Sequence, residues 1–139
     1  MNSVKRATVA DANSLYKQAG YSGRATPTDL LYGAYRGHQC VSVTRLQEYG
    51  GQWLLRNLCT LPSERRQGLA LALCRSILID IKKTVWVFPL PGLYDLYEQA
   101  GFRTVPDEQV PEALQKVWLA TKKKYSQSQA MVAEPTGDI

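Results

Sequence analysis

The stretch from Gln67 to Ile81 constrains the fold most, because it is nearly continuous in Leu, Ala and Ile and contains no proline. A helix that is apolar over most of its circumference must lie buried against a sheet. Strand-like segments flank it, with Trp53 to Leu61 before it and the β-branched and aromatic run Thr84 to Phe88 after it. A strand, a helix and a strand of these lengths predict a βαβ unit with two parallel strands.

Shorter patterns predict the rest of a mixed α+β fold. Two helices are expected, one capped by Asp11 and running to Ala19, and one from Leu93 to Ala100 that ends at Gly101. Strands are also expected. They comprise a first strand over Val4–Val9, an antiparallel meander over Leu31–Tyr35, Cys40–Leu46 and Trp53–Leu61, and a closing hairpin over Phe102–Val105 and Lys116–Thr121.

The length of 139 residues, with 45% apolar and 21% charged residues, is typical of one soluble globular domain. We expect this domain over residues 1–125 and a flexible polar tail over residues 126–139. No apolar run reaches the roughly 20 residues of a membrane-spanning helix, and the N-terminus lacks the apolar stretch of a signal peptide. A cytoplasmic location without membrane contact is therefore expected.

Cysteine, histidine and charge patterns narrow the classes of function. Cys40, Cys59 and Cys74 are widely spaced in apolar surroundings, as buried structural thiols are, and His38 is the only histidine. No metal site is therefore expected. The net charge of +5 favours anionic partners. Nucleic acid is not favoured among them, because no recognised nucleic-acid motif is present and the Lys122–Lys124 run is typical of a solvated patch.

The loop between the meander and the apolar helix has the features of an anion site. Residues 58–70 read Leu-Cys-Thr-Leu-Pro-Ser-Glu-Arg-Arg-Gln-Gly-Leu-Ala. The first turn of a helix exposes unpaired N–H groups and a partial positive charge, which favour a bound phosphate. Gly68 and Ala70 are small enough for a pyrophosphate to approach the main chain, and Arg65 and Arg66 add charge.

This loop is neither a P-loop nor a dinucleotide-binding fingerprint, since the glycines that those motifs need are missing. An alternative interpretation remains open from the residues alone. Gly68 would then only allow the helix to pack on the sheet, and Arg65 and Arg66 would be solvated.

Two motifs together resemble the GCN5-related N-acetyltransferase (GNAT) superfamily. Arg65-Arg66-Gln67-Gly68-Leu69-Ala70 matches the cofactor motif Arg/Gln-x-x-Gly-x-Gly/Ala of that family. Leu96-Tyr97-Glu98-Gln99-Ala100-Gly101-Phe102 is similar to its leucine-tyrosine-x-x-x-glycine-phenylalanine segment, and the resemblance covers residues 3 to 121. It implies an acyl-CoA N-acyltransferase fold, with a mostly antiparallel sheet and one βαβ unit flanked by helices.

The resemblance also implies a function: transfer of an acetyl group from acetyl-CoA to a primary amine on a small molecule or a protein. By position, the backbone of Leu58, Cys59 and Thr60 would hold the pantetheine arm of the cofactor. The amides of Arg66, Gln67, Gly68, Leu69 and Ala70 would receive its pyrophosphate, with Arg65 at the mouth and Leu71 at the edge. Exposed strands of this fold often pair, so a homodimer is a further expectation.

The resemblance assigns Tyr97 as the general acid that protonates the departing thiolate, because the pKa values of a phenol and of the CoA thiol are reasonably matched. The alternative is that Tyr97 only packs between helix and sheet, with its hydroxyl bonded to a carbonyl group. Tyr94 lies one turn earlier and is the second candidate.

Two departures from the family pattern leave a second function open. Leu90 stands where many members have an asparagine, and the glutamate that often serves as general base is missing. Glu48 and Asp95 are the remaining acidic candidates, each more typical of a surface carboxylate, so the base is unassigned. A non-catalytic acetyl-CoA sensor is therefore the alternative function.

The resemblance implies that the acceptor groove is formed by two segments of this chain, Tyr16–Asp29 and Val105–Gln115. The second segment carries carboxylates that could attract a cationic amine, although solvated loop charge is their usual interpretation. These carboxylates are Asp107, Glu108 and Glu112.

Overall fold

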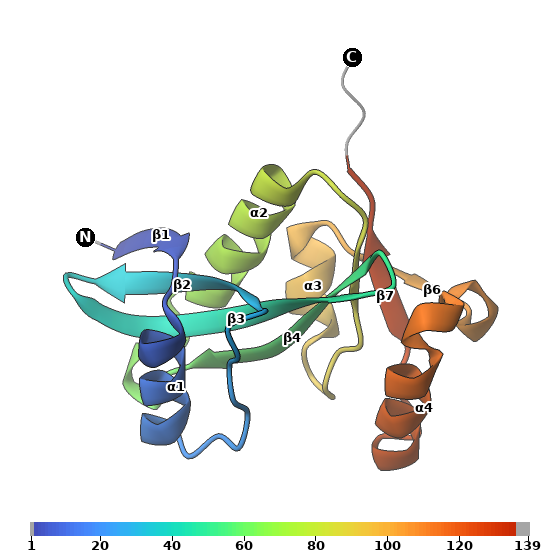
Figure 1. Cartoon of the computed structure of the whole chain (residues 1–139), viewed down its shortest axis with the longest axis horizontal. Helices are drawn as coiled ribbons and strands as arrows, with labels where there is room; N and C mark the ends of the chain where they lie inside the picture. Colours follow the sequence, from blue (N-terminus) through green and yellow to red (C-terminus); the bar gives the residue numbers. More distant parts are fainter. Residues whose placement is uncertain (1, 136–139) are drawn as a thin grey trace.

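A computed structural model describes residues 2–135 of the chain. Across these residues, seven strands form one sheet in the order β1-β2-β3-β4-β5-β7-β6, in which only β4 and β5 are parallel. Helices α2 and α3 cover one face of the sheet, and α1 and α4 lie on the other (Figure 1). The predicted mixed fold with a mostly antiparallel sheet is confirmed.

The meander extends further than its sequence pattern predicts. The strands are β2 (Leu30–Arg36), β3 (Gln39–Tyr49) and β4 (Gln52–Thr60), each antiparallel to the next. Tight turns join them, and Gly37, Gly50 and Gly51 take the positive φ angles that these turns require. The three strands place the end of β4 beside the loop that leads to the long helix.

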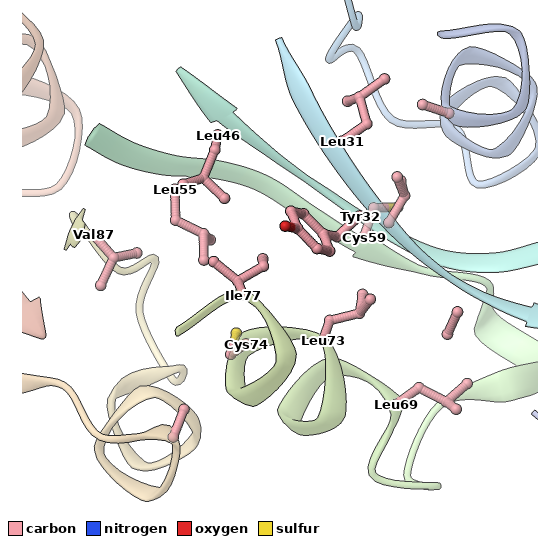
Figure 2. Packing of buried hydrophobic residues seen from close by; sticks show 14 of the residues in the cluster. Leu31, Tyr32, Leu46, Leu55, Cys59, Leu69, Leu73, Cys74, Ile77 and Val87 are labelled. Atoms are coloured by element: carbon pink, nitrogen blue, oxygen red, sulfur yellow. The ribbon is translucent and has the colours of Figure 1, made fainter. Parts of the chain in front are cut away.

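The predicted βαβ unit consists of β4, helix α2 (Leu69–Ile81) and strand β5 (Val85–Val87). Figure 2 shows Leu69, Leu73 and Ile77 of α2 turned toward the sheet, where they are buried. Each such burial contributes about 1.5–3 kcal/mol to stability. The helix begins at Leu69 rather than at Gln67, because Arg66 and Gly68 take left-handed φ angles of 65° and 75°.

The N-terminal prediction is wrong in its boundary and in its cap. Strand β1 (Asn2–Arg6) ends before Val9, where helix α1 (Val9–Gln18) begins. Thr8 is the N-cap, and its hydroxyl accepts a hydrogen bond from the Asp11 amide at 3.0 Å. The Asp11 carboxylate instead accepts a hydrogen bond from the Tyr35 hydroxyl at 2.8 Å. Asp11 thus ties the helix to β2.

The predicted closing hairpin is wrong in its second strand. Helix α3 (Tyr94–Ala100) ends at Gly101 as predicted and leads into strand β6 (Arg103–Val105). The segment from Lys116 to Thr121 is not a strand but part of helix α4 (Gln115–Lys124), which follows short 3-10 helices over Asp107–Gln109 and Glu112–Leu114. The buried Trp118 packs there against Phe88, with ring centroids 4.8 Å apart.

The expectation of a flexible tail is wrong where the chain re-enters the sheet. Residues 130–133 form strand β7 (Ala130–Ala133), which lies between β5 and β6 and is buried along its length. Ala130 and Val132 pack in one hydrophobic cluster with Trp118, whereas Met131 and Ala133 belong to the other core cluster, which explains why the whole strand is buried. The expected tail residues 136–139 lie outside the described residues.

Candidate active site

The loop from β4 to α2 opens its main chain toward a cavity. A short 3-10 helix over Pro62–Glu64 follows β4, and Gly68 then caps α2. A Cβ atom at Gly68 would meet no atom within 4 Å, so the backbone there faces open space. Glycine is required at this position for its φ of 75° rather than for lack of room.

The amides at this helix start have no internal partner. Among residues 2–135, no oxygen accepts a hydrogen bond from the backbone N–H groups of residues 66 to 71. Unpaired donors at the positive end of a helix dipole are a feature that favours a bound anion. They border a cavity of about 390 Å³.

Nine of the ten predicted cofactor residues line this cavity: Leu58, Cys59, Thr60, Arg65, Arg66, Gly68, Leu69, Ala70 and Leu71. Gln67 does not line it, since its side-chain oxygen accepts a hydrogen bond from Arg36 at 3.1 Å. Arg65 donates from Nε to the Thr60 carbonyl at 3.2 Å, which fixes this arginine across the loop. Burial raises the pKa of the Cys59 thiol, with Arg65 opposing the change, so the thiol stays protonated.

The pairing of strands β4 and β5 ends beside this cavity. Their pairing ends at Leu55 and Val87, whereas β4 runs on to Thr60, so its last residues have no β5 neighbour in the described structure. The register of β4 against β3 also shifts here, and Asn57 has a φ of 56°. Because β5 itself ends at Val87, main-chain groups of β4 beyond Leu55 have no strand partner on that side among the described residues.

A second, larger cavity adjoins the first where this pairing ends. It has a volume of about 620 Å³, and Tyr21, Leu58 and Leu93 line both cavities. Sequence reasoning missed Leu93, which precedes α3 and has no distinctive pattern. The two cavities therefore lie next to each other, with the helix amides bordering the smaller cavity and α4 forming a wall of the larger one.

Tyr97 lines the larger cavity and is only 3% exposed. Its ring packs edge-on against Phe102, with centroids 5.6 Å apart. Its hydroxyl has no hydrogen-bond partner among residues 2–135, which contrasts with the carbonyl bond of the packing alternative. Burial raises the pKa of Tyr97, so the phenol is protonated at neutral pH. Tyr94, the second candidate, accepts a hydrogen bond from the Gln129 amide at 2.8 Å and lines neither cavity.

No acidic group of the described chain faces Tyr97. Glu48 and Asp95 are exposed and line neither cavity, and the larger cavity has no Asp, Glu or His in its wall. Leu90, which replaces the asparagine of the family pattern, lines the larger cavity. Within residues 2–135, no three His, Cys, Asp or Glu side chains gather as a metal site would require.

The predicted acceptor segments are only partly present in the site. Tyr21, Ser22 and Gly23 from the first segment line the larger cavity, but no residue of Val105–Gln115 does. The Asp107 carboxylate instead forms an ion pair with Lys122. Helix α4 supplies this wall of the cavity, which the sequence assigned to a strand.

Solved structures of acetyltransferases share this fold at low sequence identity. N-acetylglutamate synthase from Neisseria gonorrhoeae, complexed with coenzyme A and N-acetyl-glutamate, superposes with a TM-score of 0.77 at 11% identity, over 99% of this chain but 36% of that one. This chain thus spans about a third of that protein. Ribosomal-protein-S18-alanine N-acetyltransferase from Escherichia coli gives 0.67 at 15% identity, over 99% and 97% of the two chains.

The N-acetyltransferase YlbP of Bacillus subtilis, in complex with coenzyme A, gives a TM-score of 0.67 at 16% identity, over 97% of each chain. No curated protein sequence is significantly similar to this chain. The fold of this chain is thus shared with these solved acetyltransferase structures. The family model described as acetyltransferase (GNAT) domain matches residues 5–117, so the chain belongs to the GNAT acetyltransferase family.

None of the helices within residues 2–135 has the length and apolar character needed to cross a membrane.

Proposed function

We propose that the chain moves the acetyl group of acetyl-CoA to a primary amine by direct attack, with Tyr97 as the general acid. One observation carries the proposal. The cavity bordered by the unpaired amides of residues 66 to 71 adjoins the cavity that contains Tyr97, and the two meet where the pairing of β4 and β5 ends. A cofactor with a phosphate end and a reactive thioester end needs this arrangement.

The pyrophosphate of the cofactor would lie against the amides of residues 66 to 70, with Arg65 and Arg66 exposed beside it. The pantetheine arm would then follow Leu58, Cys59 and Thr60 into the gap between the strands. Main-chain N–H groups of β4 that have no β5 neighbour would stabilise the oxyanion of the tetrahedral intermediate.

In the chemical step, the lone pair of a neutral amine forms a C–N bond to the thioester carbon, and the C–S bond then breaks. Tyr97 would give its hydroxyl proton to the departing thiolate and regain, through solvent, the proton that the attacking nitrogen loses as it becomes the amide. A buried phenol is a weak acid, but desolvation in the same cavity also makes the thiolate a stronger base. No residue is assigned as the base that deprotonates the incoming amine.

A second candidate function uses the same cofactor site without catalysis. The absence of Asp, Glu and His from the described wall of the larger cavity, together with Leu90, favours an acetyl-CoA sensor. A homodimer and a cytoplasmic location stay predictions. The names of the similar structures include a small-molecule and a protein acceptor, and both kinds of amine remain candidates for this chain.

The Tyr97→Phe variant distinguishes the two functions. For an acetyltransferase we expect kcat to fall by about 10²–10⁴-fold, while the Kd for CoA, measured by calorimetry, changes little. Tyr94→Phe is the matched control, because it removes a hydroxyl from the same helix outside both cavities. A sensor would bind CoA but release no thiol in the presence of amines. A variant that turns over as fast as the original chain would contradict the role of Tyr97.

A further inference from the structure

The charged side chains that line the larger cavity are all basic, and this indicates which chemical group the acceptor has. Its wall contains three basic side chains, Arg56 from β4 and Lys116 and Lys124 from α4, and no acidic residue. Lys116 and Lys124 are eight residues apart on α4, with Ala120 between them in the wall, so they share one face of the helix. The acceptor end of the site is therefore positive.

These three cations have no counter-ion among the described residues. The ion pairs within residues 2–135 join Arg36 to Glu64, Arg45 to Asp29, Arg103 to Glu134 and Lys122 to Asp107. Lys122 differs from Lys116 and Lys124 of the same helix, because it forms an ion pair with an acidic residue and does not line the cavity. All three basic side chains that line the cavity therefore lack an ion pair with a described residue.

Arg56 is held in place by neutral partners. Its Nη1 donates to the Tyr49 hydroxyl at 3.0 Å and to Gln47 Oε1 at 3.2 Å, and Tyr49 also donates to Gln47 at 2.7 Å. Its Nε and Nη2 have no partner among residues 2–135. A half-buried guanidinium with an open pair of donors fits a carboxylate, which accepts two parallel hydrogen bonds from such a group.

We infer that the acceptor is a small amine that carries a carboxylate, held by Arg56 with Lys116 and Lys124 at the far wall. This inference rests on the proposed acetyl transfer and adds the class of acceptor. The phosphates of the cofactor do not explain these cations, because the unpaired amides border the other cavity. The remaining wall is largely apolar and the volume is about 620 Å³, which suits a small molecule better than a folded partner.

The positive wall also bears on the missing general base. Nearby cations disfavour a protonated amine and lower the pKa of the incoming ammonium group. A larger fraction of the acceptor is then the neutral nucleophile at pH 7, so less help is needed from a basic residue. The same three side chains would bind the carboxylate and favour the reactive form of the amine.

Matched sets of amines test the inference. Alanine, methionine and glutamate are each compared with their α-carboxamide and their decarboxylated amine, at up to about 10 mM, above the usual range of KM. CoA release measures turnover, and the thermal shift of the CoA-loaded chain measures binding. We expect the free acids to be preferred by at least about tenfold in kcat/KM.

Arg56→Gln should remove this preference, raising KM for the acids by about 10- to 100-fold while leaving the carboxamides and the Kd for CoA nearly unchanged. Lys123→Gln is the control, because Lys123 is exposed on α4 and lines neither cavity. Equal or better use of the carboxamides, or no effect of Arg56→Gln on the preference, overturns the inference while acetyl transfer stands.

The thermal-shift measurement distinguishes failure of the proposed acetyl transfer from failure of the inferred carboxylate site. If no amine is acetylated although CoA binds, the proposed transfer fails, and the inference is then decided by thermal shift. A shift by the acids and not by the carboxamides, lost in Arg56→Gln, supports an acid-binding site. No shift by any of the three acids overturns it.

Discussion

Arg45 in β3 donates a hydrogen bond from Nη1 to Oδ1 of Asn57 in β4 across 2.7 Å, at the residue where β4 bulges. The Asn57 side chain in turn donates from Nδ2 to the Tyr21 hydroxyl at 2.8 Å, and the main-chain carbonyl of Asn57 accepts a hydrogen bond from the Tyr16 hydroxyl at 2.7 Å. Asn57 is thus held from three sides in a left-handed conformation. The bulge beside the site is built by side chains, and not only by the strand itself.

The two variants Asn57→Gly and Asn57→Ala should separate the backbone conformation from the hydrogen bonds. Both remove the contacts to Arg45 and Tyr21, but glycine accepts a φ of 56° freely, whereas alanine strains there. We expect Asn57→Ala to lose about 1 kcal/mol more free energy of unfolding than Asn57→Gly, and to bind CoA more weakly. Urea unfolding and calorimetry measure both. Equal stability of the two variants would show that the bulge is not strained.

The ion pair behind this bulge predicts a pH dependence. The Asp29 side chain is 1% exposed and accepts a hydrogen bond from Arg45 Nε at 2.8 Å. Burial raises the pKa of Asp29, but bonds from the Thr26 amide and from Arg45 outweigh it, and the net pKa is lowered. A lowered folded pKa stabilises the fold above the unfolded value, about 4, and this contribution is lost as pH falls through the folded pKa.

Asp29→Asn should therefore cost about 3 kcal/mol of unfolding free energy at pH 7, because Arg45 loses its buried counter-ion. The deficit should shrink at pH 3, below the unfolded pKa of about 4, because the carboxyl of the unfolded original chain then binds a proton and the advantage of the folded carboxylate falls. Urea titrations at the two pH values measure it. Glu48→Gln is the control, since Glu48 is an exposed carboxylate of the same sheet. A deficit that is equal at both pH values would contradict the assignment.

Sequence alone predicted those parts of the fold that depend on residues close together in the chain. The apolar helix after β4 shows its burial within thirteen residues, and Gly101 marks the end of α3 directly. The segment from Lys116 to Thr121 was predicted as a strand because it contains β-branched and aromatic residues. In the structure it is part of α4, on which only Trp118 is buried. The place of β7 between β5 and β6 depends on pairing across the whole chain, which no local pattern reports.

In the candidate site, too, the parts formed by neighbouring residues were predicted, and the parts formed by distant residues were not. The proposed cofactor residues from Arg65 to Leu71 are contiguous, so one motif and the physics of a helix start were enough to propose them. The α4 wall of the larger cavity could not be predicted, because the sequence pattern of Lys116–Thr121 predicted a strand there and not a helix. The contacts of Arg36 and Arg45 join residues far apart in sequence, and nothing in their own neighbourhood signals a partner.

The conformation of Gly68 predicts an effect on CoA binding that exceeds its effect on stability. An alanine would be strained at a φ of 75° and would place its methyl group over the open amides. Gly51→Ala is a matched control, with a φ of 86° and equally open space at the other end of β4. We expect both to lose about 1 kcal/mol of stability, and only Gly68→Ala to weaken CoA binding, by about tenfold. Equal CoA affinities would place the pyrophosphate elsewhere.

Arg36 predicts a charge effect on the same cavity. Its Nε donates to Glu64 Oε1 at 2.7 Å and its Nη2 to Glu64 Oε2 at 3.2 Å, and Glu64 lines the cavity of the unpaired amides. Without Arg36, the carboxylate of Glu64 would repel the cofactor phosphates. Arg36→Ala should therefore weaken CoA binding by about five- to tenfold at low salt, and less at high salt.

A second substitution tests whether Glu64 is the cause. In Arg36→Ala with Glu64→Gln, the repelling charge is gone, so the affinity for CoA should return to within about twofold of the original chain. Calorimetry at two salt concentrations measures all three proteins. If Arg36→Ala weakens binding through the Gln67 contact instead, the double variant will stay as weak as the single one. Recovery therefore identifies the ion pair as a shield between Glu64 and the phosphates.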